Sequence, residues 1–258
     1  MVNNNFQSGL LLCSRYAFMP NKLQYCGGDQ NATLFELTAT NDANAYLNNV
    51  LGEFETLYPY LKLIAKENNI RDPFDYRVVE AYWIGNNLLE NVKIRGLYNH
   101  FVDGLHLKKK MTNKQFELMM GEIPGQALPH HSFHVFNVWL RSGLTILPNI
   151  LDTMDQCRIS WGKIIRVGDL ELEVESPRLS MADVNSGTEF YSVQDSRLIF
   201  SPPQVIKVQY KMLGESFIEN PQIGDWVSIH WGWVCDKLTK EQVKNLEKYT
   251  LHNLHLVK

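Results

Sequence analysis

The chain has 258 residues, 45% of them hydrophobic, and a formal net charge of −3 at pH 7. A chain of this length and composition buries one sizeable core or two smaller ones. The slightly acidic balance argues against a nucleic-acid surface, since the basic run Lys108-Lys109-Lys110 is short and typical of a solvated loop.

The cysteines and the apolar runs bear on the cellular compartment. Cys13, Cys26, Cys157 and Cys235 are scattered without a CxxC pair. The apolar run at 10–12 is too short for a signal peptide and lacks a charged segment before it, and no run reaches the ~18 apolar residues that span a bilayer. We therefore expect a cytoplasmic protein with reduced thiols and no membrane partner.

The first half of the chain is predicted to be helical. Helical spacing of apolar residues and helix-start signals predict a short apolar helix, or a buried segment, at 6–17 and helices at 41–69, 72–90, 93–104 and 112–120. Pro20 is expected to break the first of these helices, and Pro59 is expected to kink or split the second.

The pattern changes after Asp155. Short β-rich runs follow at 159–174, 198–200, 205–212 and 227–234, and Thr239 is expected to cap a final helix that ends near Leu254. The sequence therefore predicts an α+β fold with two domains. An all-helical domain spans 1–150, and a small OB-like β-barrel with a C-terminal helix spans 151–258.

A histidine cluster lies near the end of the helical half. His130, His131 and His134 fall within five residues, in a segment that suits a helix or a strand. In either case a spacing of four places His130 and His134 on the same face. We expect these two side chains to point into one shared pocket as metal ligands, with His131 as a further candidate. The alternative is a structural role, in which these rings lie at the surface or bond backbone carbonyls.

Glu80 and Arg15 are charged residues in unusually apolar surroundings. One interpretation is that they pair with each other, or that each caps backbone groups. The other places both in the cleft with His130 and His134, as catalytic acid–base or substrate-positioning groups.

Two segments near the C-terminus carry the strongest chemical signal. One is Cys157-Arg158-Ile159-Ser160-Trp161-Gly162-Lys163-Ile164, and the other runs from Gly224 through His230 to Leu238. Each is predicted to be a barrel strand with one soft or borderline metal ligand, Cys157 or His230. Cys235 lies at an odd offset from His230, so it is expected to point the opposite way and to pack in the core.

The order of these segments resembles the HypC family of hydrogenase-maturation chaperones over roughly residues 153–252. Those proteins have a cysteine before a Pro-Gly-Lys-Ile type segment and later a Gly-Asp-aromatic-Val-x-x-His-x-Gly stretch. The matching residues are Gly162, Lys163, Ile164, Gly224, Asp225, Trp226, Val227, His230 and Gly232. The resemblance implies that Cys157 and His230 bind the iron that will carry cyanide and carbon monoxide. The family's cysteine is N-terminal, whereas Cys157 is internal, and Trp161 stands where the family has proline.

The resemblance favours an accessory protein of NiFe-hydrogenase maturation that binds or delivers iron. Its implied partners are hydrogenase maturation proteins or the hydrogenase large-subunit precursor. A second hypothesis is a metal-dependent enzyme, using iron, zinc or another transition metal, whose helical domain makes or loads a small ligand for the iron centre. A third is a non-catalytic interaction adaptor, which the internal position of Cys157 favours slightly.

Overall fold

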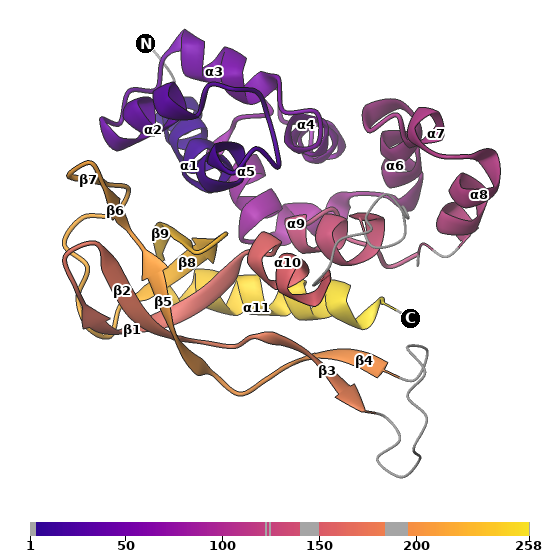
Figure 1. Cartoon of the computed structure of the whole chain (residues 1–258). Helices are drawn as coiled ribbons and strands as arrows, with labels where there is room; N and C mark the ends of the chain where they lie inside the picture. The colour runs from indigo at the N-terminus through magenta and orange to yellow at the C-terminus, as the bar shows by residue number, and fades with distance from the viewer. Residues whose placement is uncertain (1–3, 122, 124, 140–149, 184–195, 258) are drawn as a thin grey trace.

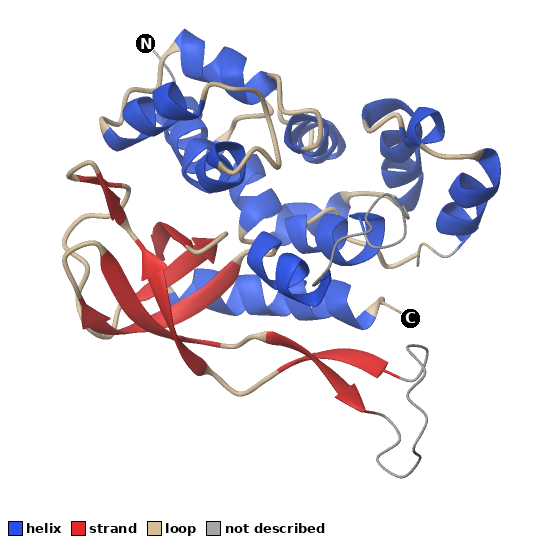
Figure 2. Cartoon of the chain, in the orientation of Figure 1, coloured by secondary structure: helices blue, strands red, loops and turns tan. Residues whose placement is uncertain are grey.

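The computed structural model describes residues 4–121, 123, 125–139, 150–183 and 196–257. Helices make up the first part of the chain, strands follow, and one long helix ends it (Figure 2). The predicted α+β class is confirmed. Within the described residues, no helix is both long enough and apolar enough to cross a membrane.

The helical part is built from short helices around a long first one. Their bounds are α1 Asn4–Lys22, α2 Asn31–Ala39, α3 Ala45–Gly52, α4 Leu57–Glu67, α5 Tyr76–Trp83, η1 Asn87–Asn91, α6 Ile94–Asn99, η2 His100–Gly104, α7 Leu107–Lys110, α8 Asn113–Gly121, α9 His131–Phe133, η3 His134–Trp139 and α10 Ile150–Cys157.

The prolines act differently from the simplest expectation. α1 continues through Pro20 to Lys22 instead of ending before it. The predicted helix at 41–69 is split into α3 and α4, and Pro59 lies in the first turn of α4, where a missing N–H breaks no helical hydrogen bond. The predicted helix at 72–90 ends early because Gly85 takes a left-handed conformation, with a φ of +96°, directly against the Tyr249 ring.

The sheet part contains β1 Ser160–Val167, β2 Glu171–Ser176, β5 Gln204–Gln209, β8 Trp226–His230 and β9 Trp233–Leu238, which close on themselves in the order β1-β2-β5-β9-β8. The closing pair of β5 and β9 is parallel and rests on Gln209 opposite Trp233, while the other neighbours are antiparallel. This strand order is that of a small OB-like barrel. Two hairpins extend from it, formed by β3 Leu179–Asp183 with β4 Ser196–Phe200, and by β6 Lys211–Met212 with β7 Glu215–Ser216.

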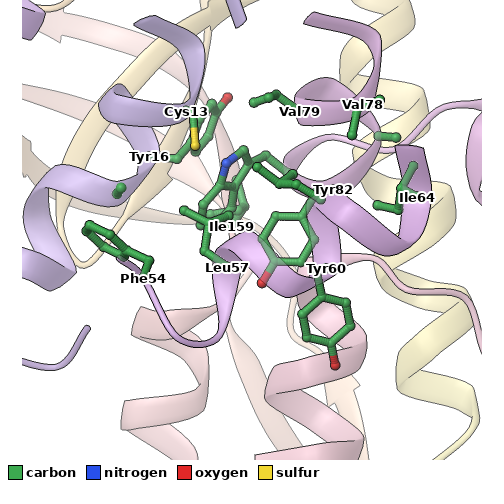
Figure 3. Close-up of a cluster of buried hydrophobic side chains, with 14 of the residues drawn as sticks. Cys13, Tyr16, Phe54, Leu57, Tyr60, Ile64, Val78, Val79, Tyr82 and Ile159 are labelled. Carbon is green, nitrogen blue, oxygen red and sulfur yellow. The ribbon is translucent and has the colours of Figure 1, made fainter. Parts of the chain in front are cut away.

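The helical part and one face of the barrel share a hydrophobic core. Trp233 and Cys235 of β9 belong to the same buried cluster as α1, α4 and α5. Ile159, just before β1, lies among Tyr16, Leu57 and Tyr82 in that cluster (Figure 3). The barrel interior is a second cluster, formed by residues such as Leu172, Val227 and Val234. The buried position of Cys235 agrees with its predicted packing role.

The last helix, α11 Lys240–His255, joins the two parts. Thr239 and Gln242 form a reciprocal capping box at its start, which is the cap that the sequence predicts. The helix then runs beneath α9 and α10 alongside the barrel (Figure 1). Asn253 donates to Ser132 Oγ at 3.0 Å, and its carbonyl accepts from Asn137 at 2.9 Å, so α11 also fixes the histidine-bearing segment.

Candidate metal centre

Three side chains from distant parts of the chain converge between the helical part and the barrel. They are His131 at the start of α9, Cys157 at the end of α10, and His230 at the end of β8. One ligand atom from each lies within 4.8 Å of the others. The structure thus brings together the two residues that the HypC resemblance singles out, Cys157 and His230, and adds His131.

His230 is held in one orientation by a backbone carbonyl. Its Nδ1 donates to the Tyr16 carbonyl oxygen at 2.7 Å, and within the described residues its buried Nε2 has no hydrogen-bond partner. A metal-binding imidazole is commonly fixed this way, with one nitrogen donating to a carbonyl while the other keeps a free lone pair. In a regular helix, the Tyr16 carbonyl would accept from the N–H of residue 20, but Pro20 has none. Pro20 therefore frees the oxygen that orients His230.

Replacing Pro20 with alanine is expected to weaken metal binding without destabilising the fold. The new N–H competes for the Tyr16 carbonyl, so His230 loses its fixed tautomer. Loss of such an outer partner lowers metal affinity by about 10- to 100-fold. Thermal melting should show equal or higher stability, because alanine suits a helix better than proline. Pro59→Ala is the matched control, and an equal loss of metal affinity in both variants would contradict this role.

His131 has a partner at each ring nitrogen. Nε2 donates to the Cys157 carbonyl at 2.8 Å, and Nδ1 lies 3.1 Å from the Tyr82 hydroxyl. The Tyr82 hydroxyl either donates to a bare Nδ1 or accepts from a protonated one. If Nε2 takes a metal, it gives up the bond to Cys157, and Tyr82 supports the tautomer with the proton on Nδ1.

The protonation states of the two imidazoles suit metal binding. Burial lowers the pKa of His230 to about 4, and burial together with the neighbouring His230 lowers the pKa of His131 well below its usual range. Both rings are therefore neutral at pH 7, as ligands must be. The Trp83 ring packs against them, with its centroid 4.7 Å from His131 and 5.6 Å from His230.

Cys157 is a neutral thiol until a cation arrives. Burial raises its pKa, and the nearby Cys26 thiol raises it further. Fast alkylation of Cys157, the behaviour of a thiolate, is therefore not expected in the metal-free protein. A bound cation reverses this, because a thiol that coordinates a metal gives up its proton.

The predicted pairing of His130 with His134 is not found in the structure. His130 is the extended N-cap of α9, with its Nδ1 2.8 Å from Ser132 Oγ and its ring stacked on Tyr249. His134 begins the π-helical segment η3 and lies 3.4 Å from the Tyr60 hydroxyl. A shared face for His130 and His134 requires one regular element through both residues. Since His130 precedes the helix, it is instead His131 that turns toward Cys157 and His230.

Glu80 and Arg15 do not pair with each other and do not line the pocket at the metal centre. Arg15 makes an ion pair with Asp236 at 2.9 Å. Glu80 accepts from Asn86 at 3.1 Å and from Gln242 at 3.0 Å. Their apolar sequence surroundings reflect partners on β9 and α11, and the proposed place of both residues in a cleft with His130 and His134 is corrected.

A pocket of about 750 Å³ opens beside the three ligands. Its wall is formed by the loop after α1, the loop between α3 and α4, and the ends of α5, α10 and β8. Besides the three ligands it includes Tyr25, Cys26, Phe54, Tyr82, Trp83, His134, Val135, Thr153 and Trp231. The charged side chains in this wall are Glu53 and Glu55. This volume falls in the range of small-molecule sites and far exceeds the space of one ion.

Two features of this site were missed by sequence reasoning. The first is His131, because a spacing of four residues favours His130 and His134 and nothing in the sequence singles out His131. The second is the role of the Tyr16 carbonyl. Pro20 has no N–H, so a helix that includes Pro20 leaves the carbonyl of residue 16 without its usual donor.

Together the fold and the site describe an α+β protein with a cluster of two histidines and one cysteine set between a helical part and an OB-like barrel. The chain belongs to the family of unknown function DUF6390, whose model matches residues 5–258. Searches of curated proteins and of solved structures found no match.

Proposed function

We propose that this protein binds a transition metal through His131, Cys157 and His230 and passes it on. The observation that carries the proposal is the convergence of the three ligand atoms within 4.8 Å. In a tetrahedral site of this composition, ligand atoms lie about 3.3–3.8 Å apart, so a modest contraction closes the centre on an ion. Neutral imidazoles and a thiol that loses its proton to a cation form a suitable ligand set for iron, zinc or copper.

The open side of the centre argues for exchange rather than a purely structural role. Structural zinc sites are closed by four protein ligands, whereas catalytic sites keep a position for water or substrate. Here the three ligands all border the pocket, so a fourth position faces it. Iron delivery in NiFe-hydrogenase maturation, to a maturation protein or the large-subunit precursor, is the specific role we propose from the HypC resemblance at Cys157 and His230.

Metal content after purification without oxygen tests the proposal. Wild type is expected to carry about one metal ion per chain, and Cys157→Ala, His131→Ala and His230→Ala less than about a tenth of that, because three ligands leave none to spare. His255→Ala, exposed on α11, is the control and should bind like wild type. Equal metal in Cys157→Ala, with the fold intact by circular dichroism, would refute the site. If no metal binds to wild type, the interaction adaptor becomes the better explanation.

A metal-dependent enzyme is the second candidate, and the size of the pocket favours it. In that case the bound ion polarises a small substrate in the pocket, and His134, which lines the pocket and lies 3.4 Å from the Tyr60 hydroxyl, is the candidate acid–base group. Zinc rather than iron in the purified protein, and retention of the ion when an apo large-subunit precursor is added, would favour this enzyme over the delivery protein.

A further inference from the structure

We propose that Cys26 supplies the fourth ligand of the metal centre from a loop that moves in and out of the pocket. This inference rests on the proposed function. It turns the His₂Cys centre into a His₂Cys₂ centre that closes when the loop is in and opens for metal transfer when the loop is out.

The first support is a buried imidazole nitrogen at the centre that has no hydrogen-bond partner within the described residues. The Nε2 atom of His230 has no partner within the described residues although His230 is only 1% exposed, and it lies on the pocket wall. Burying a polar nitrogen without a partner costs free energy, so this atom indicates a missing ligand. The resulting three-ligand centre has one position that the described side chains around it do not fill.

The second support is the place of Cys26. It is an exposed residue that lines the same pocket as Cys157 and His230. It is not among the residues whose ligand atoms lie within 4.8 Å of one another. The loop must therefore move inward for Cys26 to bind.

The third support is the construction of the loop. Asn21 holds it from inside, donating to the carbonyls of Cys26 at 3.0 Å and Gly28 at 2.6 Å. Tyr25 stacks on Trp231, the residue after His230, with ring centroids 4.3 Å apart. Cys26 thus lies between a contact to the metal-binding strand and the paired glycines at 27 and 28. Gly27 has a φ of +79°, and a Cβ there would lie 2.5 Å from the Phe54 ring, so its conformation requires glycine.

In this proposal, loading and release are ligand exchanges without electron transfer. As the ion enters, the Cys26 thiol and the Cys157 thiol each lose a proton to solvent and form a bond to the metal. As the ion leaves, a thiolate or imidazole of the acceptor replaces Cys26 in the fourth position. Cys26 is the ligand exchanged because its loop is exposed, whereas Cys157 and His230 are fixed by α10 and β8.

Cobalt titration of the full chain tests the proposal, because thiolate-to-cobalt charge-transfer absorbance counts the bound cysteines. Wild type is expected to show the intensity of two thiolates. Cys26→Ser should still bind cobalt but with about half of that absorbance, and it should release the ion to a chelator at least about tenfold faster. Cys13→Ala, which removes a buried thiol outside the pocket, is the control.

The outcomes separate this proposal from the proposed function. Suppose that Cys26→Ser gives the wild-type absorbance and release rate, while Cys157→Ser gives neither. The metal centre then stands and the role of Cys26 is refuted. If wild type binds no cobalt, the proposed function itself fails. Gly27→Ala provides a second variant with the thiol retained. Its strained loop should reproduce the faster release, and wild-type release in this variant would overturn the movable loop.

Discussion

A fall from about pH 7 to about pH 5 is expected to remove most of the stability of the metal-free protein. Burial lowers the pKa of five histidines: His100 and His130 to about 3, His134 and His230 to about 4, and His131 well below its usual range. All are therefore neutral in the folded chain at pH 7. In the unfolded chain each returns to a pKa of about 6.5.

The sign of the effect follows from proton uptake. Below about pH 6.5 the unfolded chain binds protons that the folded chain does not, so unfolding becomes easier as the pH falls. The stabilisation is complete above the unfolded pKa and is lost progressively toward the folded values near pH 3 to 4. Asp236, whose pKa burial raises, acts in the opposite direction, but it is a single group.

Each such histidine contributes a slope of about 1.4 kcal/mol per pH unit once the pH is below its unfolded pKa. Five together approach about 7 kcal/mol per unit, against a typical total stability of about 5–15 kcal/mol. Urea unfolding at a series of pH values measures the slope directly. His100→Leu should reduce this slope by about one fifth, the contribution of one of the five histidines. A free energy of unfolding that stays constant down to about pH 5 would contradict the argument.

The sequence predicted features that depend on local chemistry. Thr239 and Gln242 form the expected cap of α11, because capping needs only residues three positions apart. The β-rich runs after Asp155 form an OB-like barrel, because strand composition and turn residues are also local signals. Cys235 lies in the core as expected, but strand alternation does not explain it, because a turn at Trp231 and Gly232 places His230 on β8 and Cys235 on β9.

The candidate site was only partly predictable, because it depends on where elements begin and which segments meet. Cys157 and His230 were found through a family resemblance, and nothing local shows that His131 joins them. The sequence leaves helix or strand open for this segment, and in the structure α9 begins at His131, so His130 is its cap and His131 turns inward. Arg15 contacts Asp236, 221 residues away in the chain, and Glu80 contacts Gln242, 162 residues away. No short-range sequence pattern indicates contacts at such distances.

Replacing Asp155 with alanine is expected to destabilise the fold by about 3–5 kcal/mol, because it leaves the fully buried Arg158 without its carboxylate partner. Arg158 is 0% exposed, and its Nε and Nη2 both lie 2.8 Å from Asp155 Oδ1. Burial lowers the pKa of Arg158 to about 10, yet it stays charged at pH 7. Asp155 also accepts from the Leu179 N–H at 2.9 Å and pairs with Arg178. This network ties the end of α10, where Cys157 lies, to the start of β3.

Urea unfolding of three variants isolates the buried charge from the rest of the network. Asp155→Ala should lose the full amount, while Asp155→Leu combined with Arg158→Met should recover much of it, since apolar groups of similar size replace a buried pair at little cost. Lys237→Ala, which breaks the partly exposed pair with Asp225 at 2.6 Å, is the control and should cost at most about 1 kcal/mol. If Asp155→Ala costs no more than this control, Arg158 finds another partner or reaches water. Cys157 would then be positioned by the hydrogen bond from His131 to its carbonyl rather than by this ion pair.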